Sequence, residues 1–253
     1  MFNNFTDQQD AGTSRYFFPL LSFGFIVLYF AGMSKCTRFL LPEGAQTLTD
    51  FAIFGGVALN AILFSIIYGV FLTKMPFRWS EKQPLKYKFV AVIYGWLTSI
   101  AVSMLFALVF YLVGYKPELQ EVAKKIANIS SEYIYLVLLG PALFVPLVEE
   151  IVFRGFLYRS IVAFAEPDEL NTQIASDRKK LWTIKIIAMI TSSVIFALAH
   201  MEVHVMPQLF LLGMIFNYAY EKTGSISVAT TLHILNNFIG IAGLLINGEP
   251  LAS

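Results

Sequence analysis

Long apolar segments constrain this chain more than any other feature of its sequence. A helix that crosses a bilayer needs about 20 mainly apolar residues, because backbone polar groups in lipid must pair within the segment. Only 14% of the residues are charged, against roughly 25% in an ordinary soluble domain. The pattern predicts an all-α fold, a polytopic transmembrane helical bundle of seven to eight helices. The seven predicted spans lie at 16–34, 51–72, 87–113, 133–163, 183–201, 206–221 and 225–246.

The fourth apolar segment, 133–163, is too long for one straight crossing. As a single helix it would measure roughly 45 Å, which exceeds the hydrocarbon thickness of a bilayer. Pro141 and Pro146 each lack a backbone donor, so we expect a bend immediately before Glu149. If the bend separates two helices, the bundle has eight. Residues 116–132 are expected to form either a short amphipathic interfacial helix or an exposed loop helix.

The few charges lie mainly in the linkers and indicate an orientation. The linkers 74–88 and 159–180, with Arg15 and Lys222, place 11 Lys or Arg residues on one side of the membrane against 5 on the other. By the positive-inside rule, this side and the N terminus are expected to be cytoplasmic, unless an eighth helix inverts the C-terminal half.

The formal net charge of +1 and the lack of long runs of like charge argue against nucleic acid as a partner. The single cysteine, Cys36, excludes an intramolecular disulfide and a thiolate metal cluster.

No internal repeat or low-complexity segment interrupts the predicted spans. We therefore expect one membrane domain, with N-terminal helices and linkers at 1–132 and a chemical core at 133–247. The core contains all the ionisable side chains that fall within predicted spans, apart from those at the span ends.

Two adjacent glutamates, Glu149 and Glu150, lie well inside a predicted span. Ionisable groups in a membrane cost several kcal/mol, so by default they mark a functional site. Glu150 and Arg154 are four residues apart and share a helical face, which favours an ion pair. Glu149 points about 100° away, free to project into a cavity. The alternative is a Glu-Glu-Arg cluster that only locks two helices together.

Polar side chains of two later spans reach a similar depth. Phe196 and His200 are four residues apart, as are His233 and Asn237, so each pair lies along one helical stripe. Measured along antiparallel helices, Glu149 and His200 both lie roughly 24 Å from the linker between their helices, so they can meet. A lone membrane histidine is more often a packing residue. Two histidines, an asparagine and a glutamate at similar depth favour a catalytic site instead.

Several well-known hydrolase motifs are absent from the sequence. Residues 200–204 read HMEVH and not HExxH, although His200 and His204 could still chelate one ion. No GxSxG elbow occurs and no predicted span contains an aspartate. Glutamate and histidine therefore remain as the candidate catalytic groups.

Three short motifs in this chain resemble those of the CAAX prenyl protease type II family, also called the CPBP or ABI family of intramembrane proteases. EEIVFR at 149–154 fits EExxxR, FALAH at 196–200 fits FxxxH, and HILNN at 233–237 fits HxxxN. TGSI at 223–226 is also similar, and the resemblance covers about 135–245.

The resemblance implies peptide-bond hydrolysis within the membrane. It implies that Glu149 and His200 activate a water, that His233 and Asn237 form the oxyanion hole, and that Glu150, Arg154 and Phe196 support them. A zinc ion held by Glu149, His200 and His233 is the alternative mechanism. Because Asn237 is a poor zinc ligand and the set lacks a third imidazole unless His204 joins, we expect no required cofactor. His204 itself is expected to be interfacial.

The implied substrate is a peptide or a prenylated protein in contact with membrane lipid. Eukaryotic members of the family trim prenylated CAAX proteins, whereas bacterial members are linked to peptide processing and self-immunity. The short linkers resemble the bacterial kind, so we expect a multi-pass protein of a bacterial inner membrane. A non-catalytic transporter that uses Glu149 as a proton carrier, or a bacteriocin-immunity or scaffold protein, is the alternative function.

Overall fold

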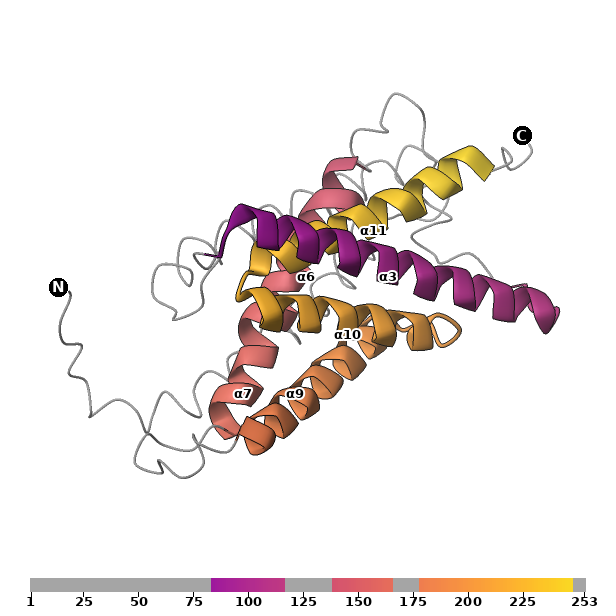
Figure 1. Cartoon of the computed structure of the whole chain (residues 1–253). Coiled ribbons are helices and arrows are strands. Elements are labelled where there is room, and N and C mark those ends of the chain that lie inside the picture. Colours follow the sequence, from indigo (N-terminus) through magenta and orange to yellow (C-terminus); the bar gives the residue numbers. More distant parts are fainter. Residues whose placement is uncertain (1–82, 117–137, 166–177, 248–253) are drawn as a thin grey trace, which may run out of the picture.

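The computed structural model describes residues 83–116, 138–165 and 178–247. These residues are helical, with no strand among them, which agrees with the predicted all-α class. Figure 1 shows the longest helix lying across the two C-terminal ones. The helices are α3 (Leu85–Leu112), α6 (Val145–Glu150), α7 (Arg159–Ala165), α9 (Arg178–Ala199), α10 (Met206–Thr223) and α11 (Ile226–Asn247), with π-helical segments at Gly140–Phe144 and Ile151–Tyr158.

Three of the described helices are long and apolar enough to cross a membrane. They are Leu85–Leu112, Lys179–Ala199 and Ile226–Leu244, close to the predicted spans 87–113, 183–201 and 225–246. Helix α10 forms where the span 206–221 was predicted but does not meet the same criterion. The predicted spans 16–34 and 51–72 and the amphipathic segment 116–132 lie outside the described residues, so the total of seven to eight spans stays a prediction.

The segment 138–165 stays helical through both prolines but contains two π-helical segments. Pro141 lies in the first turn of the π-helical segment Gly140–Phe144, and Pro146 lies in the first turn of α6. The structure has a π-helical segment before Glu149, within one continuous helical stretch, and the bend expected there stays a prediction. A second π-helical segment, Ile151–Tyr158, follows Glu150 and was not predicted. Such segments are frequent at functional sites.

The core lies around the segment 146–158. Every residue from Ile151 to Tyr158 is buried, and this stretch packs against α9, α10 and α11. By contrast, Ser99 is the only buried residue of α3, which exposes large apolar side chains such as Phe89, Leu97 and Met104. An apolar helix exposed in this way fits a lipid-facing position.

A small residue allows α9 and α10 to approach closely. A Cβ atom added at Gly213 would lie 3.0 Å from the Cβ atom and 3.1 Å from the Oγ atom of Ser193. Both residues are buried, and Ser193 also accepts a hydrogen bond from Asn217 Nδ2 at 3.0 Å. The site described below depends on this packing, because the carbonyl of Gly213 contacts Arg154.

The Gly213→Ala variant is expected to lower the free energy of unfolding by about 1–3 kcal/mol, because the added methyl group overpacks the interface. Equilibrium unfolding of the full chain in detergent would measure this loss. Gly240→Ala on α11 is the matched control, since nothing lies within 4 Å of its added Cβ atom. It should leave stability unchanged or raise it by about 0.5–1 kcal/mol. Equal effects of the two changes would contradict the close helix contact.

Candidate functional site

A buried ion pair forms the base of the site. Arg154 Nη1 donates to Glu150 Oε1 at 2.8 Å, and both side chains are fully buried. Arg154 Nη2 also donates to the carbonyl of Gly213 on α10 at 3.2 Å. The pair expected from the four-residue spacing is therefore present and also ties the segment 151–158 to α10.

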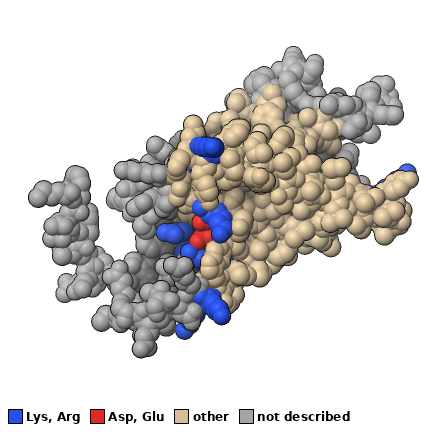
Figure 2. Space-filling view, viewed as in Figure 1, with Lys and Arg blue, Asp and Glu red and all other residues tan. Residues whose placement is uncertain are grey.

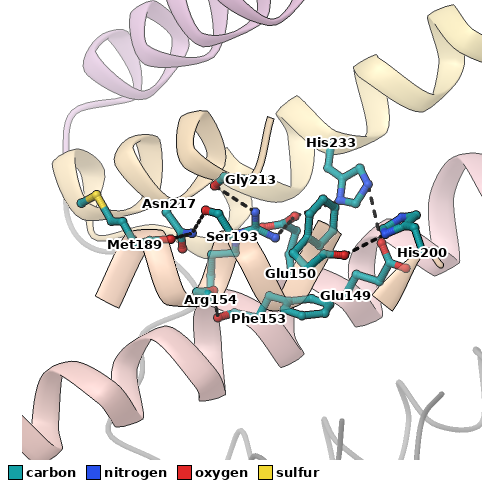
Figure 3. A network of polar contacts seen from close by, with 12 residues as sticks. Glu149, Glu150, Phe153, Arg154, Met189, Ser193, His200, Gly213, Asn217 and His233 are labelled. Atoms are coloured by element: carbon teal, nitrogen blue, oxygen red, sulfur yellow. Dashed lines mark hydrogen bonds and ion pairs between the residues drawn. The ribbon is translucent and has the colours of Figure 1, made fainter. Parts of the chain in front are cut away.

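His233 of α11 joins the two glutamates. Its Nδ1 atom lies 2.8 Å from Glu150 Oε1, and its Nε2 atom lies 3.7 Å from Glu149 Oε2. Glu149 is 6% exposed and His233 is 5% exposed. Figure 3 shows both glutamates and the two imidazoles gathered in one network. Each ring nitrogen of His233 thus faces a different carboxylate.

Aromatic rings fix the orientation of the charged groups. The Phe196 ring lies edge-on to the rings of Phe153, His200 and His233, at centroid distances of 5.1, 4.8 and 5.8 Å. The Arg154 guanidinium lies over the same Phe196 ring, 4.9 Å from its centroid. Phe196 therefore contacts both histidines and the supporting arginine, through edge-to-face and cation–π interactions.

Phe216 of α10 is a site residue that the sequence motifs did not reveal. Its ring stacks on His233, with centroids 5.1 Å apart and an interplanar angle of 29°. The Arg154 guanidinium lies 5.3 Å from its centroid. In the sequence, Phe216 is one apolar residue among many in an apolar helix, so no local signal distinguishes it.

His200 is held by its own helix. Its Nδ1 atom lies 2.9 Å from the backbone carbonyl of Phe196. Because a carbonyl oxygen only accepts, Nδ1 carries the hydrogen, and Nε2 of the neutral ring keeps a lone pair. The side chain is half-buried. This tautomer leaves Nε2 able to accept a proton.

Asn237 binds a carbonyl that the π-helical segment leaves free. The amide N–H of Val145 donates to the carbonyl of Gly140, five residues back. In this pattern the carbonyl of Pro141 would pair with residue 146, which is a proline and has no N–H. Asn237 Nδ2 donates to the Pro141 carbonyl at 2.9 Å instead. This bond holds α11 against the turn before Glu149.

The four candidate catalytic residues are therefore not all in direct contact with one another. Glu149 and His233 face each other directly, and His200 and His233 both contact the Phe196 ring. Asn237 follows His233 by one helical turn on α11. Within the described part of the chain, no hydrogen bond joins Glu149 to His200.

The residues of the alternative zinc site do not form a metal-binding group in this arrangement. Among the described residues, no three His, Cys, Asp or Glu side chains lie close enough together to hold a metal ion. His204, which would have completed the set, lies on the loop before α10, with Nε2 3.8 Å from Glu202 Oε2 and the side chain 23% exposed. We therefore derive no chemical step through zinc.

A cavity of about 650 Å³ lies away from these residues. It opens between the C-terminal end of α3 and the start of α10, and Ser103, Ala107, Phe110, Tyr111, Gly114, Tyr115, Lys116, Val205 and Gln208 line it. Glu149 does not line this cavity, and the cavity expected beside Glu149 stays a prediction. The half-buried side chains of His200 and Asn237 form the more accessible part of the candidate site.

Comparisons with known proteins agree with the motifs. Residues 131–239 match the family model of the type II CAAX prenyl endopeptidases, Rce1-like. Over 106 residues the chain is 36% identical to the membrane-embedded CAAX protease MroQ of Staphylococcus aureus (strain USA300). The aligned part is 42% of this chain and 38% of that relative's length. No solved structure matches the chain. Residues 131–239 are thus similar to the Rce1-like type II CAAX prenyl endopeptidases, which is the family that the EExxxR, FxxxH and HxxxN motifs resemble.

Proposed function

We propose that this protein is an intramembrane endopeptidase that hydrolyses a peptide bond of a lipid-modified or hydrophobic peptide or protein. The single observation that supports this most directly is the buried Glu149 carboxylate facing Nε2 of His233, in the segment that matches the endopeptidase family. A buried carboxylate at such a site is suited to act as a general base, and the imidazole that faces it is suited to donate to the developing oxyanion.

In the proposed reaction, Glu149 and His200 activate a water molecule. The water oxygen attacks the peptide carbonyl carbon while Glu149 accepts a proton from the water. His200 assists through Nε2, which its bond to the Phe196 carbonyl leaves as an acceptor. The proton then passes to the leaving nitrogen as the carbon–nitrogen bond breaks. The two products are an amine and a carboxylic acid, which keeps the second proton of the water until it releases it to the amine or to solvent.

The proposed oxyanion hole consists of His233 and Asn237. Protonated His233 donates from Nδ1 to Glu150 and can donate from Nε2 to the developing oxyanion. With Glu149, Glu150 and Arg154 ionised, the four side chains of this cluster then carry no net charge, which lowers the cost of burying them. Asn237 uses one amide hydrogen for Pro141, and the other remains for the substrate.

The family match favours peptidase activity over the alternative functions. A proton-carrying transporter or a non-catalytic immunity or scaffold protein would not require His200, His233 and Asn237 together with Glu149. We propose that 133–247 forms the catalytic core and 1–132 the preceding helices of the same membrane domain. We further propose a multi-pass location in a bacterial inner membrane and a mechanism without a required metal.

The Asn237→Ala variant tests the oxyanion hole. Loss of one oxyanion donor typically costs about 10²- to 10³-fold in kcat, and we expect a loss of this size. The full chain would be purified in detergent and assayed by mass spectrometry with two substrates, a farnesylated peptide ending in a CAAX sequence and an unmodified hydrophobic peptide. Cleavage of neither substrate by the unaltered protein would contradict the proposed function.

Asn236→Ala is the matched control, because Asn236 is the neighbouring residue and lies outside the HxxxN stripe. It should keep kcat within about threefold of the unaltered protein, as expected for a residue that contacts no reacting group. Equal losses in the two variants would remove Asn237 from the mechanism. Treatment with a strong zinc chelator should leave the rate unchanged, and a loss restored by zinc would contradict the metal-independent mechanism.

A further inference from the structure

Three parts of the chain that are distant in sequence meet at one end of the described helices. The hydroxyl of Tyr87, at the start of α3, donates to the backbone carbonyl of Lys222, at the end of α10, at 3.3 Å. The Nζ atom of Lys222 lies 4.9 Å from the centroid of the Trp182 ring, in the first turns of α9. The starts of α3 and α9 and the end of α10 therefore lie together. We call this region the basic end.

Positive charge dominates the basic end. Its described basic residues are Lys86, Lys88, Arg159, Lys179, Lys180, Lys185 and Lys222. Figure 2 shows Lys and Arg side chains gathered over this region around a small acidic area, while most of the rest of this face is uncharged. The sequence within 74–88, 159–185 and 221–222 holds 11 Lys or Arg against 6 Asp or Glu. The excess of positive charge therefore extends to the adjoining linkers.

The acidic side chain described at this end is already engaged. Glu221 Oε1 pairs with Lys185 Nζ at 2.5 Å, and Glu221 Oε2 accepts a hydrogen bond from the Tyr158 hydroxyl at 2.7 Å. Both carboxylate oxygens therefore have partners within the protein. Glu221 therefore pairs with Lys185 and not with Lys86 or Lys222, and the positive charges of these two lysines attract anions.

Amphipathic aromatic rings surround the amine of Lys222. This Nζ atom lies 4.9 Å from the Trp182 ring and 5.4 Å from the Tyr218 ring. Trp182 is 39% exposed, Tyr218 53% and Tyr87 43%. Tryptophan and tyrosine concentrate where the membrane meets water, because one part of the ring system is apolar and another part is polar.

The position of the basic end along the helices matches a membrane surface. Two of the candidate spans, Leu85–Leu112 and Lys179–Ala199, begin here. At the other end of α3, Lys116 is the only basic residue among described residues 113–116. The basic end is therefore the part of the described surface best placed to meet charged headgroups.

We propose that the basic end binds the phosphate groups of anionic phospholipids in one leaflet, with Lys86 and Lys222 among the contacting cations. Polybasic segments next to a membrane are attracted to anionic lipid, and each lysine contributes separately. The side concerned is the one that the charge distribution predicted to be cytoplasmic. This inference does not depend on the peptidase chemistry, because none of the proposed catalytic residues lies at the basic end.

Native mass spectrometry of the full chain in detergent tests this proposal. The protein would be titrated with phosphatidylglycerol or with phosphatidylcholine, and the lipid-bound fraction would be measured. We expect phosphatidylglycerol to bind more tightly, by about fivefold or more. The double variant Lys86→Glu and Lys222→Glu should weaken phosphatidylglycerol binding by about tenfold or more. High salt should reduce the difference between the two lipids.

Lys116→Glu at the opposite end of α3 is the control, and its matched partner is the single variant Lys86→Glu, which makes the same charge change at the basic end. The Lys116 variant should shift phosphatidylglycerol binding by less than about twofold. If the reversed pair prevents folding, Lys86→Gln with Lys222→Gln replaces it, with a smaller loss expected. Equal binding of the two lipids, or equal losses in the Lys116→Glu and Lys86→Glu variants, would overturn the proposal. Displacement of the lipid by inorganic phosphate at the same concentration would also overturn it, because the site would then bind small anions.

Discussion

Replacing Glu149 by glutamine is expected to lower kcat/KM for peptide hydrolysis by about 10²- to 10⁴-fold, the usual contribution of a positioned proton acceptor. Glutamine keeps the shape of the side chain but cannot take a proton from water. The measurement is the cleavage rate of the peptide that the unaltered protein cuts fastest. Because Glu149 takes the proton in the transition state, kcat and kcat/KM should fall together, so the loss should appear at every substrate concentration.

Glu202→Gln is the control, because it makes the same glutamate-to-glutamine change at a different position. Glu202 lies on the loop near His204, outside the candidate site, so this variant should retain its rate within about threefold. The unfolding temperature of each variant would show whether the fold persists. If folded Glu149→Gln cleaved the peptide as fast as the unaltered protein, Glu149 would not be the proton acceptor.

The Arg154→Met variant is expected to have the largest effect on stability. It leaves His233 as the remaining partner of the buried Glu150 and one buried negative charge uncompensated, which typically costs about 3–5 kcal/mol. It also removes the bond to the Gly213 carbonyl and the contacts with the Phe196 and Phe216 rings. Equilibrium unfolding in detergent micelles would measure the change in the free energy of unfolding.

Two further variants separate the unpaired charge from lost packing. Glu150→Gln combined with Arg154→Met should be more stable than Arg154→Met alone, because no buried charge then lacks a partner. Arg159→Met changes an exposed arginine five residues later and should shift stability by no more than about 0.5 kcal/mol. An Arg154→Met protein as stable as the Arg159→Met protein would show that the buried pair does not support the fold.

The two roles of the adjacent glutamates follow from their different neighbours. Glu150 contacts both Arg154 and His233 through Oε1, and these strong bonds suit it to hold other groups in place. Glu149 has His233 Nε2 at 3.7 Å, beyond a strong hydrogen bond. The looser contact is the one that a proton acceptor needs, since its carboxylate must also reach water and substrate.

Local patterns in the sequence predicted the described helices, one buried ion pair and a resemblance to one enzyme family. Runs of apolar residues predicted the described spans to within a few residues, because a helix in lipid must satisfy its own backbone. The spacing of Glu150 and Arg154 predicted their ion pair, because four residues make about one helical turn. The three motifs likewise indicated the family before any contact was known.

Only the tertiary structure decided how the helices face one another. That His233 would meet both glutamates, that Phe216 would stack on it, and that Asn237 would bind the Pro141 carbonyl depend on contacts between separate helices. The same is true of the contact between Tyr87 and Lys222 that assembles the basic end. Helical periodicity tells which residues share a face of one helix, but the rotation and depth of each helix against its neighbours come from side-chain packing across the whole bundle.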